Sequence, residues 1–366
     1  MSADRDGELQ GVRDRIDAID RELQRLLNER AGAVRRVADI KAKDAGGEAP
    51  VFYRPEREAQ ILARVKRENT GPLSDDDMAR LFREIMSCCL ALEQPLTIAY
   101  LGPSGTYTEA AAIKQFGHFV ATRAAASIDE VFREVESDAA HYGVVPVENS
   151  TEGMVNHTLD CFVTSRLRIC AEVELPIHHA VLAAPGTARE SIREIYSHQQ
   201  SFAQCRRWLD AHFPHCERIA VSSNAEAARL VAGRSDAAAV AGEVAAERWG
   251  LRVLASRIED QPDNKTRFLV IGKQRVGPSG ADKTSILVST RNEPGALYRV
   301  LEPFHRHGIS LTRIETRPSR TGSWSYVFFI DFDGHETDPE IARVLADVEA
   351  VSLEVKSLGS YPQAVV

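Results

Sequence analysis

The stretch LLNERAGAV, residues 26–34, decides how the first third of the chain folds. It lies inside a heptad pattern with two seam positions, occupied by Leu9, Ile16, Leu23, Arg30 and Val37 and by Val12, Ile19, Leu26, Ala33 and Ile40. This pattern predicts one long helix over residues 8–43 that packs against other helices along the seam. Arg30 is the charged residue that interrupts the apolar seam.

A charge at Arg30 facing a helical core costs several kcal/mol unless an anion pairs with it. The anion is either a protein carboxylate or a bound ligand. Lys41 lies about three turns further on with ~20° of rotation, so both cations share one face ~16 Å apart. Arg13 is roughly a quarter turn off that face, and a partner helix would supply it more easily. With Arg57 and Glu58, these residues fit either a pocket for a ligand with several carboxylates or surface charge beside a coiled coil.

Two shorter helices complete the first third of the chain. Pro55 suits the first turn of a helix that stops at residues 69–71, and Ser74 suits the N-cap of a helix running to about Glu93. Residues 1–95 are therefore predicted to be all α. Three helices leave the long seam short of partners, so we expect two chains to pair along the first helix as a homodimer.

The composition limits the classes of partner and compartment. With 366 residues the chain exceeds one small core, so two or three domains are expected. No apolar run is long enough to cross a bilayer, and the acidic N-terminus does not resemble a signal peptide, which predicts a cytoplasmic protein. The six cysteines show no CxxC or Cys/His ligand spacing, which favours reduced thiols over disulfides or zinc. A net charge of −8 argues against nucleic acid and anionic membranes as partners.

The remaining two thirds change from helical to strand-like periodicity at Leu96. Residues 96–275 alternate apolar strands with helices, an α/β pattern. The segment KQRVGPSGADK is typical of a linker, rich in Gly, Pro and charge. Residues 283–362 follow the order βαββαβ, which is the ferredoxin-like α+β arrangement.

The strand ends of the α/β part concentrate hydroxyl, amide and acidic side chains: Ser104, Thr106 and Thr108; Glu148, Asn149, Ser150 and Thr151; Ser197 and Ser201; Ser222, Ser223 and Asn224; Thr266 and Arg267. Helix N-termini of this kind bind carboxylates or phosphates, although each residue by itself is also an ordinary N-cap. Walker, GxGxxG, GxSxG and HExxH motifs are absent from the sequence. We therefore expect no nucleotide, nicotinamide, other cofactor or metal.

Several motifs in order resemble the bifunctional chorismate mutase/prephenate dehydratase family. The basic residues of the helical part match its all-helical chorismate mutases. GPSGTYTEAA, VPVENSTEG, SHQQSFAQC, SSNAEAA and TRF match its prephenate dehydratases, and PGALY with IETRPS matches the GAL and ESRP motifs of its ACT regulatory domain. Gln199, Asn224 and Arg54 depart from the family pattern. The resemblance implies a mutase domain over 1–95, a two-lobed dehydratase domain like periplasmic binding proteins over 96–275, and an ACT domain over 283–362.

The resemblance also implies roles in a mutase site. Arg30 would hold a carboxylate of chorismate inside the helical dimer, and Arg13 would reach in from the other subunit. Lys41 would donate to the ether oxygen, because a Claisen rearrangement needs only a held conformer and stabilisation of developing charge. Arg57 and Glu58 belong to the same set. Glu93 stands where relatives have glutamine and can donate only when protonated, unless the neighbouring Gln94 takes this role.

For the dehydratase, the resemblance places Thr266 nearest the leaving hydroxyl and Phe268 in the pocket wall. It implies positioning or proton transfer by Glu148, Asn149, Ser197 and Gln204, and substrate contacts by Thr106, Ser150, Thr151 and Arg267. Prephenate must lose CO₂ and hydroxide, and hydroxide leaves poorly without a donor.

The ACT match implies inhibition by phenylalanine, bound by Gly295, Ala296, Leu297, Glu315, Thr316, Arg317 and Pro318. The ligands implied for the whole chain are chorismate, prephenate and phenylalanine. Two other functions stay open: an amino-acid sensor without catalysis, and a dehydratase whose helical third only dimerises.

Overall fold

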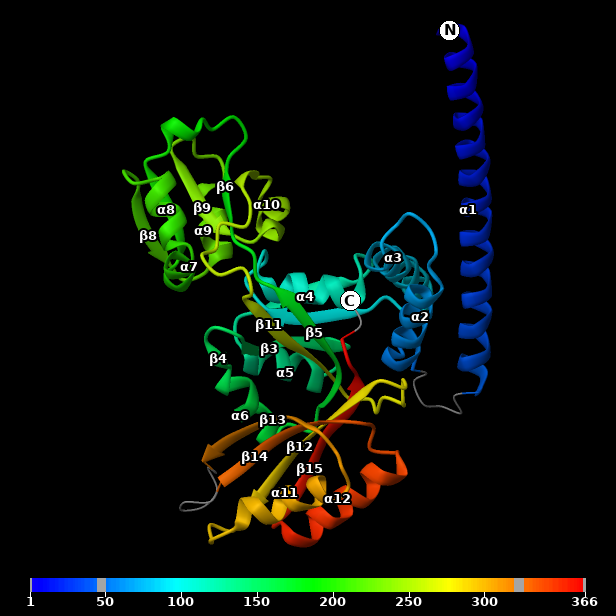
Figure 1. Ribbon diagram of the computed structural model, residues 1–366, viewed down its shortest axis with the longest axis vertical. Helices are drawn as coiled ribbons and strands as arrows, with labels where there is room; N and C mark the ends of the chain where they lie inside the picture. Colours follow the sequence, from blue (N-terminus) through cyan, green and yellow to red (C-terminus); the bar gives the residue numbers. More distant parts are fainter. Residues whose placement is uncertain (1, 45–50, 319–325, 365–366) are drawn as a thin grey trace.

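The computed structural model describes residues 2–44, 51–318 and 326–364, which form three parts along the chain (Figure 1). The first part holds α1 (Ser2–Asp44), α2 (Pro55–Glu68) and α3 (Asp75–Glu93). Ser74 caps α3 by accepting from Asp77 N at 3.1 Å, and Pro55 opens α2, as predicted. The predicted break after α1 covers residues 45–50, which lie outside the described ranges.

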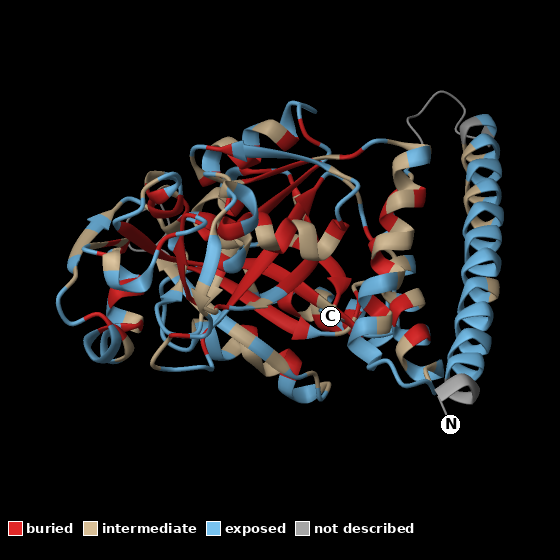
Figure 2. Cartoon of the chain, turned by 90° about the horizontal axis from the view of Figure 1, so that it is seen from above, coloured by how far each residue is buried: buried red, intermediate tan, exposed pale blue. Residues whose placement is uncertain are grey.

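The helix α1 stands beside α3 with most of its surface in solvent (Figures 1 and 2). The eight large apolar residues of its seam, from Leu9 to Ile40, are each 46–58% exposed. An apolar stripe of this length is rare on a monomer and marks an interaction surface. The predicted long helix is confirmed, and one chain does not bury its seam.

The second part has two α/β lobes, as predicted. The first lobe has a mixed sheet of order β2-β1-β3-β11-β5, with β4 paired to β3. Its strands are β1 (Thr97–Leu101), β2 (Ala121–Ala125), β3 (Tyr142–Asn149), β4 (Gly153–Met154), β5 (Arg168–Pro176) and β11 (Lys265–Gly272). Its helices are α4 (Tyr107–Phe116), α5 (Ile128–Glu136) and α6 (Asn156–Thr164).

The second lobe has a sheet of order β10-β6-β9-β7-β8. Its strands are β6 (Ala180–Ala183), β7 (Glu194–His198), β8 (Glu217–Val221), β9 (Ala237–Ala241) and β10 (Arg252–Ala255). Its helices are η1 (Arg189–Ser191), α7 (Gln199–Gln204), α8 (Arg206–His212), α9 (Asn224–Val231) and α10 (Glu243–Trp249). The chain crosses between the lobes in two neighbouring segments. Hydrogen bonds join these segments, from Ile177 N to Asn264 O at 2.8 Å and from Ile258 N to His179 O at 3.0 Å.

The third part is the predicted βαββαβ unit. It comprises β12 (Asp282–Thr290), α11 (Ala296–Arg306), β13 (Leu311–Pro318), β14 (Tyr326–Asp333), α12 (Pro339–Val351) and β15 (Glu354–Pro362), in the antiparallel sheet order β13-β14-β12-β15. Strand β15 packs beside β5 of the first lobe, so the third part is docked onto the dehydratase-like part. None of the helices in the described ranges is long and apolar enough to span a membrane.

Candidate active sites

Three ionisable groups of the helical part gather between α1 and the end of α3. Within the described residues, Nη1 of Arg30 and Oε2 of Glu93 are buried and have no hydrogen-bond partner. Burial raises the pKa of Glu93, although Lys41 and Arg30 are near enough to lower it. Gln94 instead contacts His141, with Nε2 atoms 3.2 Å apart. Glu93 therefore faces the two cations, and buried groups without partners are the mark of a site made for a polar ligand.

The other predicted mutase residues do not join this cluster in one chain. Arg13 is exposed and lies roughly 26 Å from Arg30 along the same helix. Arg57 is exposed as well. The Glu58 carboxylate pairs with Arg83 of α3 at 3.4 Å, where residues of the dehydratase-like part also pack, and burial raises the pKa of Glu58. In a single chain Glu58 therefore does not join the mutase set to which the resemblance assigned it, because a nearer cation holds its carboxylate at the domain junction.

At the end of β3, Asn149 organises the first wall of a second site. Its Nδ2 donates to Thr266 Oγ1 at 2.9 Å and to Asn264 Oδ1 at 2.8 Å. Its Oδ1 accepts from the backbone N–H groups of Thr151 and Glu152. Thr266 is 8% exposed, and no acceptor for its hydroxyl hydrogen occurs among the described residues. Asn149 thus fixes the Thr266 oxygen and leaves its O–H able to donate.

A cavity of about 690 Å³ opens beside this wall between the two lobes. It is lined by Thr151, Glu152, Gln200, Ala203, Gln204, Arg206, Arg207, Asp210, Asp260, Gln261 and Asn264. Gln204 accepts from Asn264 Nδ2 at 3.3 Å and contacts Glu152 Oε1 at 3.4 Å, which joins the second lobe to the first. The structure therefore brings Thr151 and Gln204 into the cavity lining, and Asn149 links Thr266 to that lining through Asn264.

Buried residues at the crossing between lobes extend this site and were missed by the sequence analysis. Nε2 of His179 lies 2.8 Å from Gln204 Oε1, and its Nδ1 lies 2.9 Å from the Tyr107 hydroxyl. Burial lowers the pKa of His179 and raises that of Tyr107, so both groups are held neutral. Glu259 accepts from the His179 amide at 2.9 Å and contacts His178 Nδ1 at 2.7 Å. The adjacent pair His178-His179 before an apolar strand was the available signal.

Three predicted dehydratase residues lie away from the cavity. Ser197 has no accessible surface and donates to Val240 O at 2.8 Å, so its placement does not support the positioning or proton-transfer role that the resemblance implied. Phe268 is buried in the first-lobe core rather than in the pocket wall. The Thr106 hydroxyl donates to Leu101 O at 3.1 Å and caps α4, so it serves the helix rather than a ligand. Asn224 accepts from His198 N at 3.0 Å and thereby holds the turn into α7.

The alternation of side chains along β11 sends Arg267 to the face opposite Thr266. Its guanidinium is buried and bonds Glu172 Oε2 at 2.8 Å, Asp331 Oδ2 at 2.7 Å and Tyr361 OH at 3.0 Å. Lys283 adds a bond to Glu172 Oε1 at 2.8 Å, so the charges in this cluster balance. Arg267 therefore reaches the third part rather than the substrate cavity, which corrects its predicted role.

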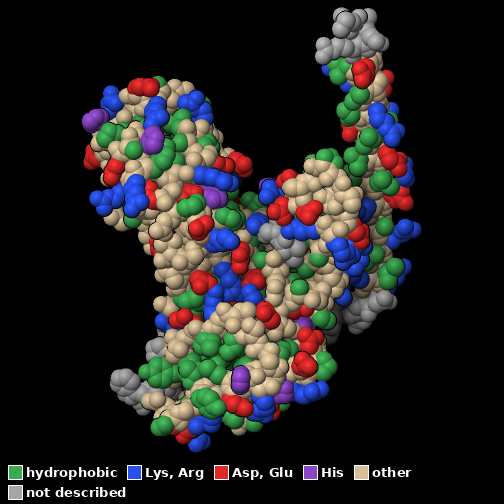
Figure 3. All heavy atoms as spheres, viewed as in Figure 1, with side chains coloured by type: hydrophobic (Ala, Val, Ile, Leu, Met, Phe, Trp, Pro, Cys, Tyr) green, Lys and Arg blue, Asp and Glu red, His purple; other side chains and the backbone are tan. Residues whose placement is uncertain are grey.

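Glu148 and Ser150 share the face of Arg267. Glu148 pairs with Arg313 of β13. These residues line a cavity of about 310 Å³ between the two parts, together with Glu174, Lys265, Lys283 and Thr312. Figure 3 shows the acidic and basic side chains gathered in the middle of this face, where the parts meet. The predicted direct role of Glu148 in catalysis is not supported by this placement, because its carboxylate is held by the third part.

Comparison with known proteins places all three parts in known families. Residues 12–94 match the family of chorismate mutase type II, residues 98–276 match prephenate dehydratase, and residues 284–350 match the ACT domain. A bifunctional chorismate mutase/prephenate dehydratase from Pseudomonas aeruginosa is 58% identical over 99% of this chain and 100% of its own length. The chain belongs to the bifunctional chorismate mutase/prephenate dehydratase family. A relative from Neisseria gonorrhoeae with the same description is 51% identical over 96% of both chains.

Solved structures resemble the dehydratase and ACT parts of this family member. The prephenate dehydratase from Arthrobacter aurescens, in complex with L-Phe, has a TM-score of 0.68 at 36% identity and covers 74% of this chain and 90% of its own. The enzyme from Staphylococcus aureus has a TM-score of 0.61 at 28% identity over 73% of this chain and 100% of its own.

The predicted phenylalanine residues lie at two places on the ACT domain. Gly295 has φ +78° and begins α11, where Leu297 is exposed. Glu315 and Thr316 lie on β13, and Arg317 pairs with Asp160 of α6 at 3.0 Å. Pro318 ends this strand, and its side chain lies outside the described residues. Arg317 thus connects the predicted ligand segment to the dehydratase domain.

Proposed function

We propose that this chain rearranges chorismate to prephenate in its helical part and converts prephenate to phenylpyruvate, CO₂ and water in the cleft between its lobes. The observation that carries the proposal is the pair Asn149–Thr266 directly behind the cavity lining, where Asn149 bonds the lining residue Asn264 and a positioned threonine hydroxyl can still donate. The whole-chain likeness to bifunctional enzymes supports both steps. We infer the domains 1–95, 96–275 and 283–362 for the mutase, dehydratase and ACT units.

In the mutase pocket the protein supplies position and charge rather than a nucleophile. The unpartnered Arg30 Nη1 would bind a substrate carboxylate, and Lys41 would donate to the ether oxygen as its charge develops. Protonated Glu93 would give that oxygen a second donor. Arg13 and Arg57 are exposed in one chain, so we propose that Arg13 of a second copy completes the pocket when two α1 seams pair.

In the dehydratase cleft the reaction is a decarboxylation that expels a hydroxyl group. The electron pair of the breaking C–CO₂ bond aromatises the ring and displaces hydroxide, which takes up one proton to leave as water. The Thr266 O–H would hydrogen-bond the departing oxygen, while Asn149 keeps the threonine in place. Gln204 and Thr151 line the same cavity and would hold the substrate. The neutral pair His179 and Tyr107 would fix Gln204 between the lobes.

Phenylalanine would inhibit the dehydratase from the ACT domain, at Gly295, Ala296 and Leu297. A glycine there lets backbone approach the ligand, and its φ of +78° disfavours a side chain. Gly308 offers a matched control, because it ends the same helix with φ +68° and open space around a Cβ. Gly295→Ala should weaken inhibition at least about tenfold, whereas Gly308→Ala imposes the same backbone cost and should leave it unchanged. Equal inhibition constants in both variants would place the regulatory site elsewhere.

The deciding experiment supplies the purified chain with chorismate or prephenate, with and without phenylalanine. We expect prephenate from chorismate, phenylpyruvate from either substrate, and loss of the second activity with phenylalanine. Dehydratase without mutase activity would reduce the helical part to a dimerisation element. Neither activity, with phenylalanine still bound, would make the chain a sensor. The cytoplasmic location expected from the apolar pattern and the acidic N-terminus stays a prediction.

A further inference from the structure

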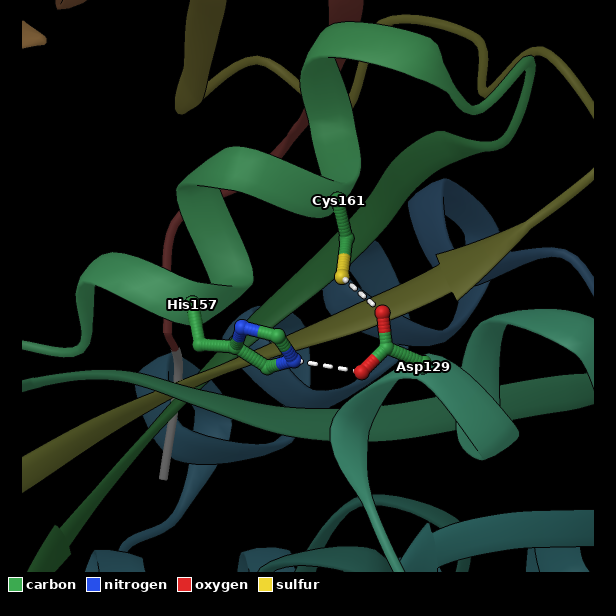
Figure 4. Close-up of side chains that lie close together, drawn as sticks. All are labelled: Asp129, His157 and Cys161. Carbon is green, nitrogen blue, oxygen red and sulfur yellow. Dashed lines mark hydrogen bonds and ion pairs between the residues drawn. The ribbon is translucent and has the colours of Figure 1, made fainter.

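Three side chains outside both proposed active sites converge between α5 and α6 (Figure 4). Asp129 lies in the first turn of α5, and His157 and Cys161 lie one turn apart on α6. One carboxylate oxygen of Asp129 is 2.5 Å from His157 Nε2, and the other is 3.6 Å from Cys161 Sγ. The three ligand atoms all lie within 4.8 Å of one another.

These separations fit the edges of a small coordination polyhedron. Zinc bonds of about 2.0 Å to oxygen or nitrogen and about 2.3 Å to sulfur give tetrahedral edges of roughly 3.3–3.5 Å. The 3.6 Å between Cys161 Sγ and Asp129 Oδ1 matches such an edge. His157 Nε2 contacts the other oxygen, Oδ2, at 2.5 Å, so the imidazole and the carboxylate must shift until Nε2 lies about 3.3 Å from the oxygen that binds the ion. His157 and Asp129 have half-exposed side chains, so this adjustment moves no core residue.

The donor set selects the kind of ion. A thiolate and an imidazole are poor ligands for Mg²⁺ and Ca²⁺, which take oxygen, whereas thiolate, imidazole and carboxylate together suit Zn²⁺. Two negative ligands and a neutral imidazole would balance a divalent cation, and the exposed side of the site leaves room for a water as fourth ligand.

We propose that Asp129, His157 and Cys161 form a Zn²⁺ site that clamps α5 to α6. On binding, Cys161 loses its thiol proton to solvent, and the neutral His157 ring carries its proton on Nδ1 while Nε2 binds the ion. Helix α6 also carries Asp160, which pairs with Arg317 of the ACT domain, and Lys356 of that domain donates to Phe162 O at 2.8 Å. The ion would therefore stabilise the helix onto which the ACT domain docks.

The test adds Co²⁺ to the metal-stripped, reduced full-length protein and records its absorption. One equivalent should produce the thiolate-to-cobalt charge-transfer band of a cysteine-ligated ion, and Zn²⁺ should abolish it. Cys161→Ser should remove the band, and His157→Gln should weaken binding at least about tenfold, since even residues behind metal ligands commonly contribute 10–100-fold. Cys216→Ser changes another partly buried thiol, in the second lobe, and should leave the band unchanged.

Dehydratase activity with prephenate shows that each variant is folded, because none of the three residues lies at the cavity. A band that persists in folded Cys161→Ser, or that is lost equally in Cys216→Ser, overturns the proposal. Absence of a band in the wild-type protein at stoichiometric Co²⁺ also overturns it. If Cys161→Ser is unfolded, His157→Gln decides, because its side chain is exposed and its loss leaves the core intact.

Discussion

Thr266 shows how much of a reaction can rest on one hydroxyl with a defined direction. Its oxygen is already engaged by Asn149, so its hydrogen is the part left for a ligand. The hydroxyl of an exposed threonine would sample several rotamers and so would point in several directions. Thr266 is only 8% exposed, and the hydrogen bond from the Asn149 side-chain amide fixes its hydroxyl before substrate arrives. Such preorganisation is the condition for electrostatic stabilisation of a leaving group.

Thr266→Ala should therefore lower dehydratase kcat by about 10²–10³-fold, the usual cost of removing one such donor. Thr266→Ser keeps the hydroxyl and should retain activity within about tenfold of wild type. Initial rates of phenylpyruvate formation measure both variants, and mutase rates on the same preparations check the fold. Equal losses in alanine and serine variants would mean that the methyl group, not the hydroxyl, matters.

Glu93 gives the mutase a predicted pH dependence. Burial raises its pKa above the ordinary range in the folded chain, which outweighs the nearby Lys41 and Arg30. The protonated acid can donate to the ether oxygen, and the carboxylate cannot. Mutase kcat/KM should thus be fully supported below the raised pKa and fall as pH rises through it. The stability follows the same sign, because a raised carboxyl pKa favours the folded state at low pH.

Glu93→Gln should flatten this profile between mildly acidic and neutral pH and preserve or raise the neutral activity. The dehydratase rate of the same variant provides the control, since Glu93 lies in another domain. A flat wild-type profile together with a large loss in Glu93→Gln would show that the carboxylate itself is needed.

At the scale of elements, periodicity predicted the architecture better than the motifs predicted contacts. The heptad pattern predicted α1, and the structure confirms both this helix and the predicted βαββαβ order of the third part. Site residues were harder because a motif states which residues recur and not which face of a strand they occupy. Thr266 and Arg267 are neighbours in TRF, yet Thr266 bonds Asn149 beside the cavity and Arg267 bonds the ACT domain. Ser197 in SHQQSF is buried and donates to Val240 of β9.

The cluster at α6 was missed for a related reason. Cys161 and His157 are four residues apart, which a helix turns into neighbours, but their third partner Asp129 comes from another helix 28 positions upstream. Searching for paired Cys/His motifs cannot find a site that two separate elements assemble. In the mutase cluster, helix geometry placed Arg30 and Lys41 on one face, and family resemblance added Glu93 from another helix.

The exposed seam of α1 leads to a prediction about assembly. Fully burying a large apolar side chain is worth about 1.5–3 kcal/mol, so each half-exposed seam residue can add roughly 1 kcal/mol to a dimer. If two chains pair along this seam as proposed, Leu26→Lys should yield monomers and abolish mutase activity, because it charges the seam and removes the pocket that two chains would share. Gln24→Lys adds the same charge outside the seam and should change neither chain pairing nor mutase activity.

Sedimentation velocity gives the mass of each variant, and mutase assays over a range of protein concentrations test the link. Loss of mutase activity in a Leu26→Lys protein that remains dimeric would separate catalysis from α1 pairing. Dimers of unchanged stability in both variants would show that another surface holds the chains together.

At the scale of the whole molecule, the strands that carry the dehydratase site also contact the ACT domain. Asn149 ends β3 and Thr266 is the second residue of β11, and the residues beside them, Glu148 and Arg267, bind Arg313 and Asp331 of the ACT sheet. A movement of the ACT domain would therefore pull on the two strands that carry the site. Phenylalanine inhibits through such contacts only if it binds the less active arrangement more tightly.

Arg313→Gln should weaken the contact between the ACT domain and Glu148 without removing a residue that lines the cavity between the two lobes. We expect dehydratase activity within a few-fold of wild type and a phenylalanine effect weakened by about 5–150-fold, the usual range of allosteric coupling. Arg343→Gln makes the same change at an exposed residue of α12 and should leave inhibition unaltered. Inhibition curves with prephenate, alongside direct measurement of phenylalanine binding, distinguish lost coupling from lost binding. Arg313 lies on β13 near the proposed ligand segment. If Arg313→Gln weakens inhibition and phenylalanine binding equally, Arg313 belongs to the ligand site. Transmission through Glu148 requires weakened inhibition while phenylalanine still binds the ACT domain with near-normal affinity.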